Sequence, residues 1–198
     1  MLITERDLKL VRHFEEYKFA TINQIEKMFF RNQTYSYNIA RRRLLELKKF
    51  GYIKVSRDSL TNKNIYLYND KGIKMPSLHR ILILEVLAEI KFNGFNVEVF
   101  EVEKHWGNGK YVSDGFTIFT VNNRRYHFFI EVQLSNSYHN LEKYDKLYET
   151  GEVQKYLNKN FFPRVLLISD REYPNINLQH TNVIQLNTKL DSFATILI

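Results

Sequence analysis

Three side chains that could bind a metal ion lie between positions 111 and 135. Asp114 is near the start of one predicted strand, and Glu131 and Gln133 are near the end of the next. Because successive side chains of a strand alternate between its two faces, Glu131 and Gln133 share one face. Two carboxylates and an amide close together offer hard oxygen ligands. Such ligands suit Mg²⁺ or Mn²⁺ better than a soft metal.

The residues around these three predict the hairpin that would bring them together. Residues 112–120 and 125–134 alternate with β-branched and aromatic types, and Asn122-Asn123 between them favours a tight turn. Antiparallel pairing about that turn places Asp114 beside Glu131. The second strand is apolar around Glu131, where a carboxylate is costly unless it is paired or bound to a metal. The alternative is two unrelated acids on a solvated strand edge.

The composition limits the kind of protein. The chain has 198 residues and an apolar fraction of 44%, which fits one large or two small globular domains. No apolar run reaches the length of a membrane span, and the first ten residues lack the pattern of a secretory signal, so we expect a cytoplasmic protein. The absence of cysteine excludes disulfides, iron–sulfur clusters and thiol catalysis.

The positive charge is concentrated in the first third of the chain. Residues 1–75 hold 16 Lys and Arg against 8 Asp and Glu, whereas residues 76–198 hold 13 against 14. A basic module beside a nearly neutral one is typical of a protein in which one part neutralises phosphate and the other has a different task.

The basic part has the pattern of a winged helix-turn-helix. Three helices are predicted over residues 4–17, 21–30 and 34–49, the first two after the N-cap residues Thr4 and Thr21. A β-hairpin is predicted over residues 52–68, after which Gly72 and Pro76 mark a linker. The sequence therefore predicts a DNA-binding domain over 1–75 and a second domain over 76–198.

The third helix is expected to enter the major groove of double-stranded DNA. At 100° per residue, one side carries Tyr37, Ala40, Leu44 and Leu47 and should pack on the other helices, while the opposite side carries Tyr35, Asn38, Arg42 and Lys49. Arg42 suits guanine and Asn38 suits adenine. The basic residues expected to meet phosphates are Arg41, Arg43, Lys48, Lys54, Arg57 and Lys63. The alternative is a solvated basic helix with no ligand.

The second domain is predicted to read helix, three strands, helix, strand. A helix over 77–91 carries Glu85 among aliphatic residues, either on a narrow exposed strip or turned toward the metal ligands. The other elements are predicted as strands over 97–102, 112–120 and 125–134, a loop over 103–110, a long helix over 136–158, and strands over 164–169 and 182–186. The apolar end, 193–198, is either a last strand or the cut end of a longer protein.

This order of elements resembles a nuclease family. The segments Val112-Ser113-Asp114-Gly115-Phe116 and Phe128-Phe129-Ile130-Glu131-Val132-Gln133, followed by residues 144–148 on a helix, look like the PD-(D/E)XK fold. With the winged helix, the chain resembles the replication-relaxation family of mobile elements and the related MobC-type conjugative relaxases. The resemblance implies an α+β fold in which a winged helix-turn-helix precedes a restriction-endonuclease-like αβββαβ domain.

The resemblance also implies roles for particular residues. Asp114 and Glu131 would bind the divalent metal together with the carbonyl of Val132, and Glu85 would match the acid on the first helix of many members. Gln133 departs from the family pattern, because active nucleases most often have lysine there. The missing positive charge would come from a second metal or from Lys143 or Lys146 on the next helix, unless the domain has lost catalysis.

Other chemistries have weaker support. The six histidines are too widely separated for the His-x-His site of most relaxases, and Tyr138 is the best placed of the tyrosine nucleophiles. The segment 107–110, Gly-Asn-Gly-Lys, is too short for a phosphate loop and is expected to be a mobile loop beside Asp114, with Lys110 and His105 able to approach DNA.

Two functions follow from these predictions. The first is a DNA relaxase or nickase of a mobile element, which binds an origin-of-transfer site and cuts one strand by metal-dependent phosphodiester hydrolysis. Its partners would be double-stranded DNA and other transfer or replication proteins. The second is a non-catalytic regulator of plasmid replication or transcription, in which the nuclease-like domain serves dimerisation or DNA grip.

Overall fold

The computed structural model describes residues 3–58, 62–135, 141–173 and 176–197 and contains both α-helices and β-sheets. Within these residues it has six α-helices, a three-stranded sheet and a five-stranded sheet, which confirms a mixed α+β class. The chain forms two compact units, residues 1–92 and 93–198. No helix among the described residues is long and apolar enough to cross a membrane.

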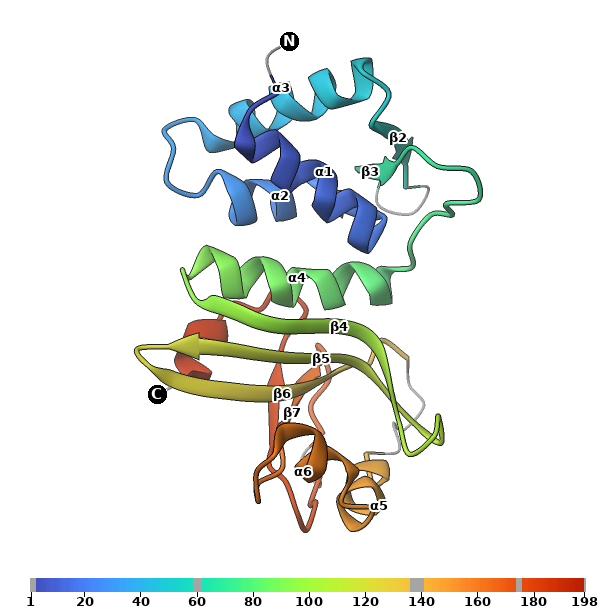
Figure 1. Ribbon diagram of the computed structural model, residues 1–198, viewed down its shortest axis with the longest axis vertical. Helices are drawn as coiled ribbons and strands as arrows, with labels where there is room; N and C mark the ends of the chain where they lie inside the picture. The colour runs from blue at the N-terminus through green and yellow to red at the C-terminus, as the bar shows by residue number, and fades with distance from the viewer. Residues whose placement is uncertain (1–2, 59–61, 136–140, 174–175, 198) are drawn as a thin grey trace. The chain divides into compact units, whose positions relative to one another are not determined.

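Three helices form the centre of the first unit (Figure 1): α1 (Glu5–Tyr17), α2 (Ile22–Phe29) and α3 (Ser36–Lys49). Thr4 and Thr21 cap the first two, each in a capping box in which the side chain three residues on binds back to the cap. Both predicted starts are confirmed. The helices enclose a core that includes Leu10, Phe14, Ile25, Leu44 and Leu47.

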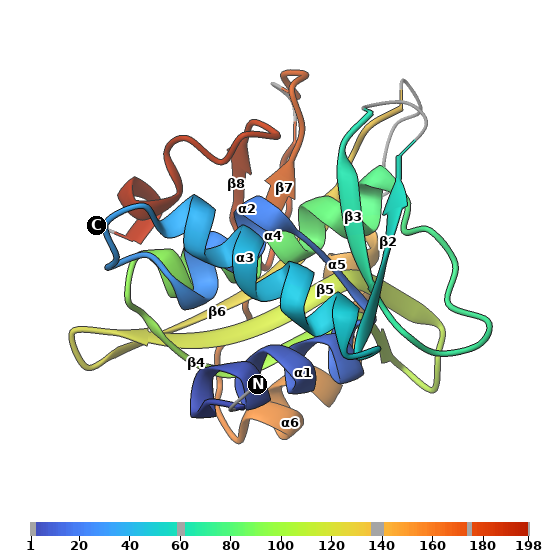
Figure 2. The ribbon, with the colours of Figure 1, turned by 90° about the horizontal axis from the view of Figure 1, so that it is seen from above.

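A small antiparallel sheet adjoins these helices. Strands β2 (Ile53–Arg57) and β3 (Asn64–Tyr68) form the predicted hairpin, which runs beside the end of α3 in Figure 2. A short strand that the sequence did not predict, β1 (Phe19–Thr21), pairs with β3. Three residues between two helices are too few for a visible alternation, and the pairing with β3 decides their conformation.

Helix α4 (Leu78–Phe92) packs on α2 within the same unit. Lys27 Nζ lies 2.5 Å from a carboxylate oxygen of Glu85 and of Glu89, and the amide of Gln24 donates to the carbonyl of Ile81. Arg31 donates to two carbonyls at the end of α4. The contacts therefore place the boundary after Phe92, whereas the sequence predicted it at position 75, where the linker residues lie.

The second unit is built on one sheet with the strand order β4-β5-β6-β7-β8. Its strands are β4 (Asn96–Trp106), β5 (Tyr111–Val121), β6 (Arg124–Val132), β7 (Arg164–Ile168) and β8 (Val183–Leu186). The first three pair antiparallel, and β6, β7 and β8 run parallel. The predicted strands and their order are confirmed.

The loop predicted over residues 103–110 is mostly strand. β4 continues to Trp106, and only the segment from Gly107 to Lys110 turns, closed by hydrogen bonds from Gly109 to Trp106 and from Lys110 to Gly107. Glu103 has a φ of 53°, outside the range of a regular strand. It interrupts the alternation of side chains between the two faces of β4, and that alternation is the sequence pattern from which a strand is predicted. Gly107 also has a positive φ, and a Cβ there would meet the ring of Tyr111 at 2.9 Å.

The predicted long helix is two short ones, α5 (Lys143–Glu149) and α6 (Glu152–Leu157), which lie together on one side of the sheet (Figure 1). Gly151 has a φ of 68°, which an α-helix does not accommodate, so the chain breaks there. The expected start at 136 or 137 is outside the described residues. The apolar end is a 3₁₀ helix, Phe193–Leu197, instead of a strand.

Candidate active site and DNA-binding surface

Asp114 and Glu131 lie where β5 and β6 separate. The pairing of the two strands runs to Gly115 opposite Ile130, so the next positions in register are Asp114 and Glu131. Beyond that point β6 pairs with β7 only, and the N–H of Val132 donates to Asp114 Oδ2 at 2.8 Å. The Asp114 carboxylate thus accepts a strand N–H in place of a backbone carbonyl. We call this point, formed by Asp114, Glu131 and Val132, the fork.

Glu131 is fully buried and is held by two residues of α5. Its Oε1 atom accepts a hydrogen bond from the hydroxyl of Tyr144 and lies 2.7 Å from Lys143 Nζ. Burial and the nearby carboxylate of Asp114 raise the pKa of Glu131 to about 7, against the opposing effect of Lys143 and Tyr144. The carboxylate of Asp114 is therefore close enough to disfavour the charge on Glu131.

Of the two lysines predicted to supply positive charge, the structure brings Lys143 to the fork. Its ammonium group also donates to the carbonyl of Val112 at 2.7 Å. Lys146 is exposed on α5, three residues further along the helix. The buried side of α5 carries Tyr144 and Leu147, and Lys143 reaches the fork from the edge of that side.

Gln133 follows Glu131 on the same strand end and is buried. Its side-chain nitrogen donates to the carbonyl and hydroxyl oxygens of Ser135 at 3.0 and 3.1 Å, and its main-chain N–H donates to the carbonyl of Ile168. These bonds fix the end of the strand beside the fork.

Glu85 forms an ion pair with another helix. It belongs to the first unit, where its carboxylate pairs with Lys27, and its side chain is 17% exposed. Its carboxylate, like that of Glu89, is thus in an ion pair with Lys27 instead of on a solvent-exposed strip, and the metal-ligand role stays a prediction.

The donor set at the fork fits a small hard cation. Among the described residues no group of three or more His, Asp or Glu side chains converges, so two carboxylates and main-chain oxygens are the available ligands. Mg²⁺ is commonly held by one or two carboxylates and completes its coordination with water and substrate phosphate. The Asp114 and Glu131 pair supplies two carboxylates of this kind, and the Val132 carbonyl is the predicted third ligand.

Tyr144 is the site residue that the sequence did not identify. It is fully buried and its ring packs 4.6 Å from that of Phe129, as expected of a core aromatic, which is how the sequence pattern presents it. Its hydroxyl bond to Glu131 has no signature in the sequence, because it depends on where α5 crosses the sheet. The other tyrosine considered, Tyr138, is outside the described residues.

The first unit presents the predicted polar side of α3. Ala40, Leu44 and Leu47 are buried, and the exposed residues are Tyr35, Asn38, Arg41, Arg42, Lys48 and Lys49. Tyr37 was expected on the packing side, but it is 46% exposed. It lies one turn before Arg41. Burial raises the pKa of Tyr66 in β3, Tyr37 raises it further and Arg41 opposes the rise, so this edge of α3 faces the hairpin.

Arg43 is the exception among the basic residues of α3. Its guanidinium forms two hydrogen bonds to the buried carboxylate of Asp7 and a third to Glu46. These bonds and the capping bond with Thr4 hold the pKa of Asp7 below its usual value in spite of burial. Arg43 therefore ties α3 to α1, and we leave it out of the proposed DNA contacts.

The three basic residues expected on the hairpin are at its surface. Lys54 donates to the carbonyl of Asp70, and Arg57 donates to the carbonyl of Asn62, which closes the hairpin loop. Lys63 is exposed at the other side of that loop. The central residues of the loop, 59–61, are outside the described residues.

Comparison of the chain with protein-family models, with curated proteins and with solved structures gives no match.

Proposed function

We propose that this protein binds a specific duplex DNA site through its first unit and cuts one strand with its second unit, by metal-dependent phosphodiester hydrolysis. The observation that carries the proposal is the fork, where two carboxylates from adjoining strands meet beside the half-buried Lys143. We infer a DNA duplex as the substrate because the first unit is basic and carries exposed lysine and arginine side chains.

The first unit supports a winged helix-turn-helix assignment. The order α1, β1, α2, α3, β2, β3, with β3 between β1 and β2, gives three helices and a hairpin wing. α3 presents Asn38 and Arg42, and both side chains suit bidentate contact with base edges in the major groove. Lys54, Arg57 and Lys63 on the hairpin would then meet the phosphate backbone.

The second unit supports a nuclease-like assignment of the PD-(D/E)XK kind. Three antiparallel strands, a crossover through α5 and α6 and a parallel β7 give the strand order that the motif requires. The helix that would come first in that fold, α4, groups with the first unit by its contacts. The assignment therefore rests on the sheet and on the residues of the fork.

Each residue at the fork has a role in the proposed reaction. Asp114 and Glu131 would hold the cation, and Tyr144 keeps the Glu131 carboxylate in place through its hydroxyl. A bound Mg²⁺ or Mn²⁺ supplies an activated water and offsets charge on the phosphate. Lys143 pairs with Glu131 and would stabilise the phosphate charge that Gln133, being neutral, does not.

The biological substrate that we propose is the origin of transfer or replication of a mobile element. This part of the proposal rests on the resemblance of the winged helix and nuclease-like pairing to replication-relaxation proteins and MobC-type relaxases. Nicking at such a site needs site recognition and single-strand cutting in one protein. In this proposal the first unit recognises the site and the second unit cuts the strand.

The test is the conversion of supercoiled plasmid carrying the cognate origin to open circles, with Mg²⁺ or Mn²⁺. The wild type should nick, and Asp114→Asn and Glu131→Gln should each remove nicking while binding the same duplex with unchanged affinity. Arg42→Ala should weaken binding to the origin and leave the fork intact. Absence of nicking by the wild type with either metal, on plasmid that it binds, would overturn the proposed cutting.

A second function has one specific observation in its favour. The ammonium group of Lys143 already pairs with Glu131, and no third acidic side chain converges there within the described part of the chain. If the ion pair replaces a bound metal, the fork has only a structural role, and the protein is a non-catalytic regulator of plasmid replication or transcription. In the same assay, such a protein would bind the origin and leave the plasmid supercoiled.

A further inference from the structure

A second candidate site lies at the opposite end of β6 from the fork. A cavity of about 690 Å³ opens where β6 and β7 begin, beside the segment that joins α6 to β7. Its lining is basic and aromatic: Asn123, Arg124, Arg125, Tyr126, His127, Phe128, Lys159, Phe161, Phe162, Pro163, Arg164 and Leu197. No acidic residue is among the described residues that line it, and its volume is that of a site for a small organic ligand.

Most of the positive charge of this cavity is not neutralised by an acid of the described parts of the chain. Arg125 is paired with Glu98 through two hydrogen bonds. By contrast, Arg124, Lys159 and Arg164 are exposed and form no ion pair with an acid in the described parts of the chain. Three cations around one cavity repel each other, and an anion that enters between them removes that repulsion. The cavity therefore favours a ligand with more than one negative charge or with a charged backbone.

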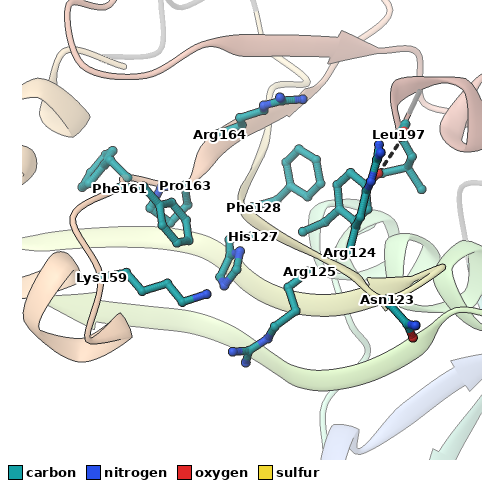
Figure 3. Close-up of a pocket in the computed structure, with 12 residues that line it drawn as sticks. Asn123, Arg124, Arg125, His127, Phe128, Lys159, Phe161, Pro163, Arg164 and Leu197 are labelled. Atoms are coloured by element: carbon teal, nitrogen blue, oxygen red, sulfur yellow. Dashed lines mark hydrogen bonds between the residues drawn. The ribbon is translucent and has the colours of Figure 1, made fainter.

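The aromatic groups of the cavity add a flat apolar surface. The ring of Phe161 meets the ring of His127 edge to face at 4.6 Å, and Lys159 Nζ lies 5.6 Å from the centre of the Phe161 ring. Figure 3 shows Lys159, His127 and Phe161 on one side of the cavity and Arg124 with Leu197 on the other. Burial, and then the neighbouring charges of Arg125 and Lys159, lower the pKa of His127 to about 4, so this ring is neutral at pH 7.

We infer that this cavity binds a nucleotide segment of a single DNA strand, with a base against Phe161 and phosphates between Lys159, Arg124 and Arg164. Proteins that hold single strands without reading their sequence combine a basic groove with aromatic rings on which bases stack. An acidic peptide would use the cations but would gain nothing from the ring. A nucleotide chain uses both.

The position of the cavity relates it to the fork. His127 and Glu131 are four residues apart on β6 and share one face, which corresponds to roughly 13 Å along the strand. Arg164 pairs with Phe128 at the same end of the sheet. Phe129, which lies between them, is fully buried against Tyr144 and Phe162, so a strand held in the cavity does not run along this face. A path from the cavity to the carboxylates around the edge of the sheet, unlike the binding itself, rests on the proposed cutting function.

The test measures how tightly the full-length protein binds a fluorescent ten-nucleotide thymidine strand in the presence of EDTA. Binding is measured by fluorescence anisotropy at several salt concentrations. The double variant Lys159→Ala/Arg164→Ala should bind at least tenfold more weakly, with a salt slope lower by about 1.4, because each phosphate contact to a single strand contributes about 0.7. Phe161→Leu keeps the apolar volume and should lose about tenfold, since stacking of one base is worth on the order of 1–3 kcal/mol.

The control is Arg171→Ala/Lys189→Ala, which removes the same charges from exposed positions outside the cavity and should bind as the wild type does. Equal affinity of the two double variants, or no binding by the wild type, would overturn the inference. So would equally tight binding of a ten-residue glutamate peptide, or displacement of the strand by thymidine monophosphate at the same concentration as by unlabelled strand. Because the assay contains neither duplex nor metal, its failure is distinct from a failure of nicking.

Discussion

Lys143 Nζ lies 2.7 Å from Glu131 Oε1 and 2.7 Å from the carbonyl oxygen of Val112, so one ammonium group joins α5 to both strands of the fork. The contact places the Lys143 ammonium group beside the Glu131 carboxylate. This ammonium group has the charge that Gln133 lacks, but it comes from the helix instead of the strand.

Replacement of Lys143 should reduce cutting more than binding. Lys143→Met keeps most of the side-chain volume and removes the charge near the phosphate, so we expect the nicking rate to fall about a hundredfold or more, as when one charge-stabilising group is lost. Rates of open-circle formation measure the effect. Lys146→Met on the exposed side of α5 is the matched control and should keep the wild-type rate. Equal losses of nicking rate in both variants would show that nicking depends on the total charge of α5 and not on the position of Lys143.

Glu85 should not contribute to cutting. Its carboxylate pairs with Lys27 between α2 and α4, so Glu85→Gln is expected to lower the free energy of unfolding by about 1 kcal/mol. The nicking rate should be unchanged, in contrast to Glu131→Gln. Denaturant unfolding and plasmid nicking measure the two effects. A loss of nicking without a loss of stability would restore the metal-ligand role that the family resemblance implies for Glu85.

Arg42 and Arg43 are neighbours with opposite expected effects. Arg42→Ala should weaken binding to the specific DNA site by about 1–3 kcal/mol, the value of a good base contact, without changing stability. Arg43→Ala should lower the free energy of unfolding by about 1–3 kcal/mol, because it leaves the buried Asp7 carboxylate without its guanidinium. Urea unfolding and filter binding separate the two. If Arg42→Ala weakens random and specific DNA equally, its contact is to phosphate.

Much of this arrangement could be predicted from local sequence signals. Thr4 and Thr21 mark helix starts that the capping boxes confirm, and the alternation on either side of Asn122-Asn123 places Asp114 opposite Glu131. These predictions succeed because helix capping and the alternation of side chains along a strand depend on only a few neighbouring residues.

The remaining features depend on contacts between distant parts of the chain. Lys143, and not Lys146, reaches Glu131 because of the angle at which α5 meets the sheet. The break at Gly151 follows α5 and separates it from α6. The bond from Tyr144 to Glu131 follows from the same crossing. The assignment of α4 to the first unit depends on Lys27, which is more than fifty residues away along the chain.

His13 should make the protein sensitive to acid. It is buried among the rings of Phe14, Tyr17 and Phe29, and burial, with a smaller effect of Lys91, lowers its pKa to about 3 from 6.5. Below pH 6.5 the unfolded chain binds a proton at His13 that the folded chain does not. Stability from this group is thus fully present above pH 6.5 and is lost as the pH falls toward 3.

The corresponding variant is His13→Phe, which keeps an aromatic ring and cannot titrate. Relative to this variant, the wild type should lose about 2 kcal/mol of unfolding free energy between pH 7 and pH 5, since one pKa unit corresponds to about 1.4 kcal/mol. Urea unfolding at both pH values gives the difference. His105→Gln, at an exposed position, should retain the wild-type pH dependence. If His13→Phe retains it as well, the folded chain protonates His13 over the same range as the unfolded chain.

The central claim is that Asp114 and Glu131 together hold one divalent cation. The most direct measurement is titration of the metal-free protein with Mn²⁺, with free Mn²⁺ followed by electron paramagnetic resonance at pH 8. We expect one bound ion per chain in the wild type and loss of that ion in both Asp114→Asn and Glu131→Gln, while Asp170→Asn, at an exposed acid elsewhere in the second unit, should bind as the wild type does. Binding that is absent from the wild type, or equal in all four proteins, would contradict the claim.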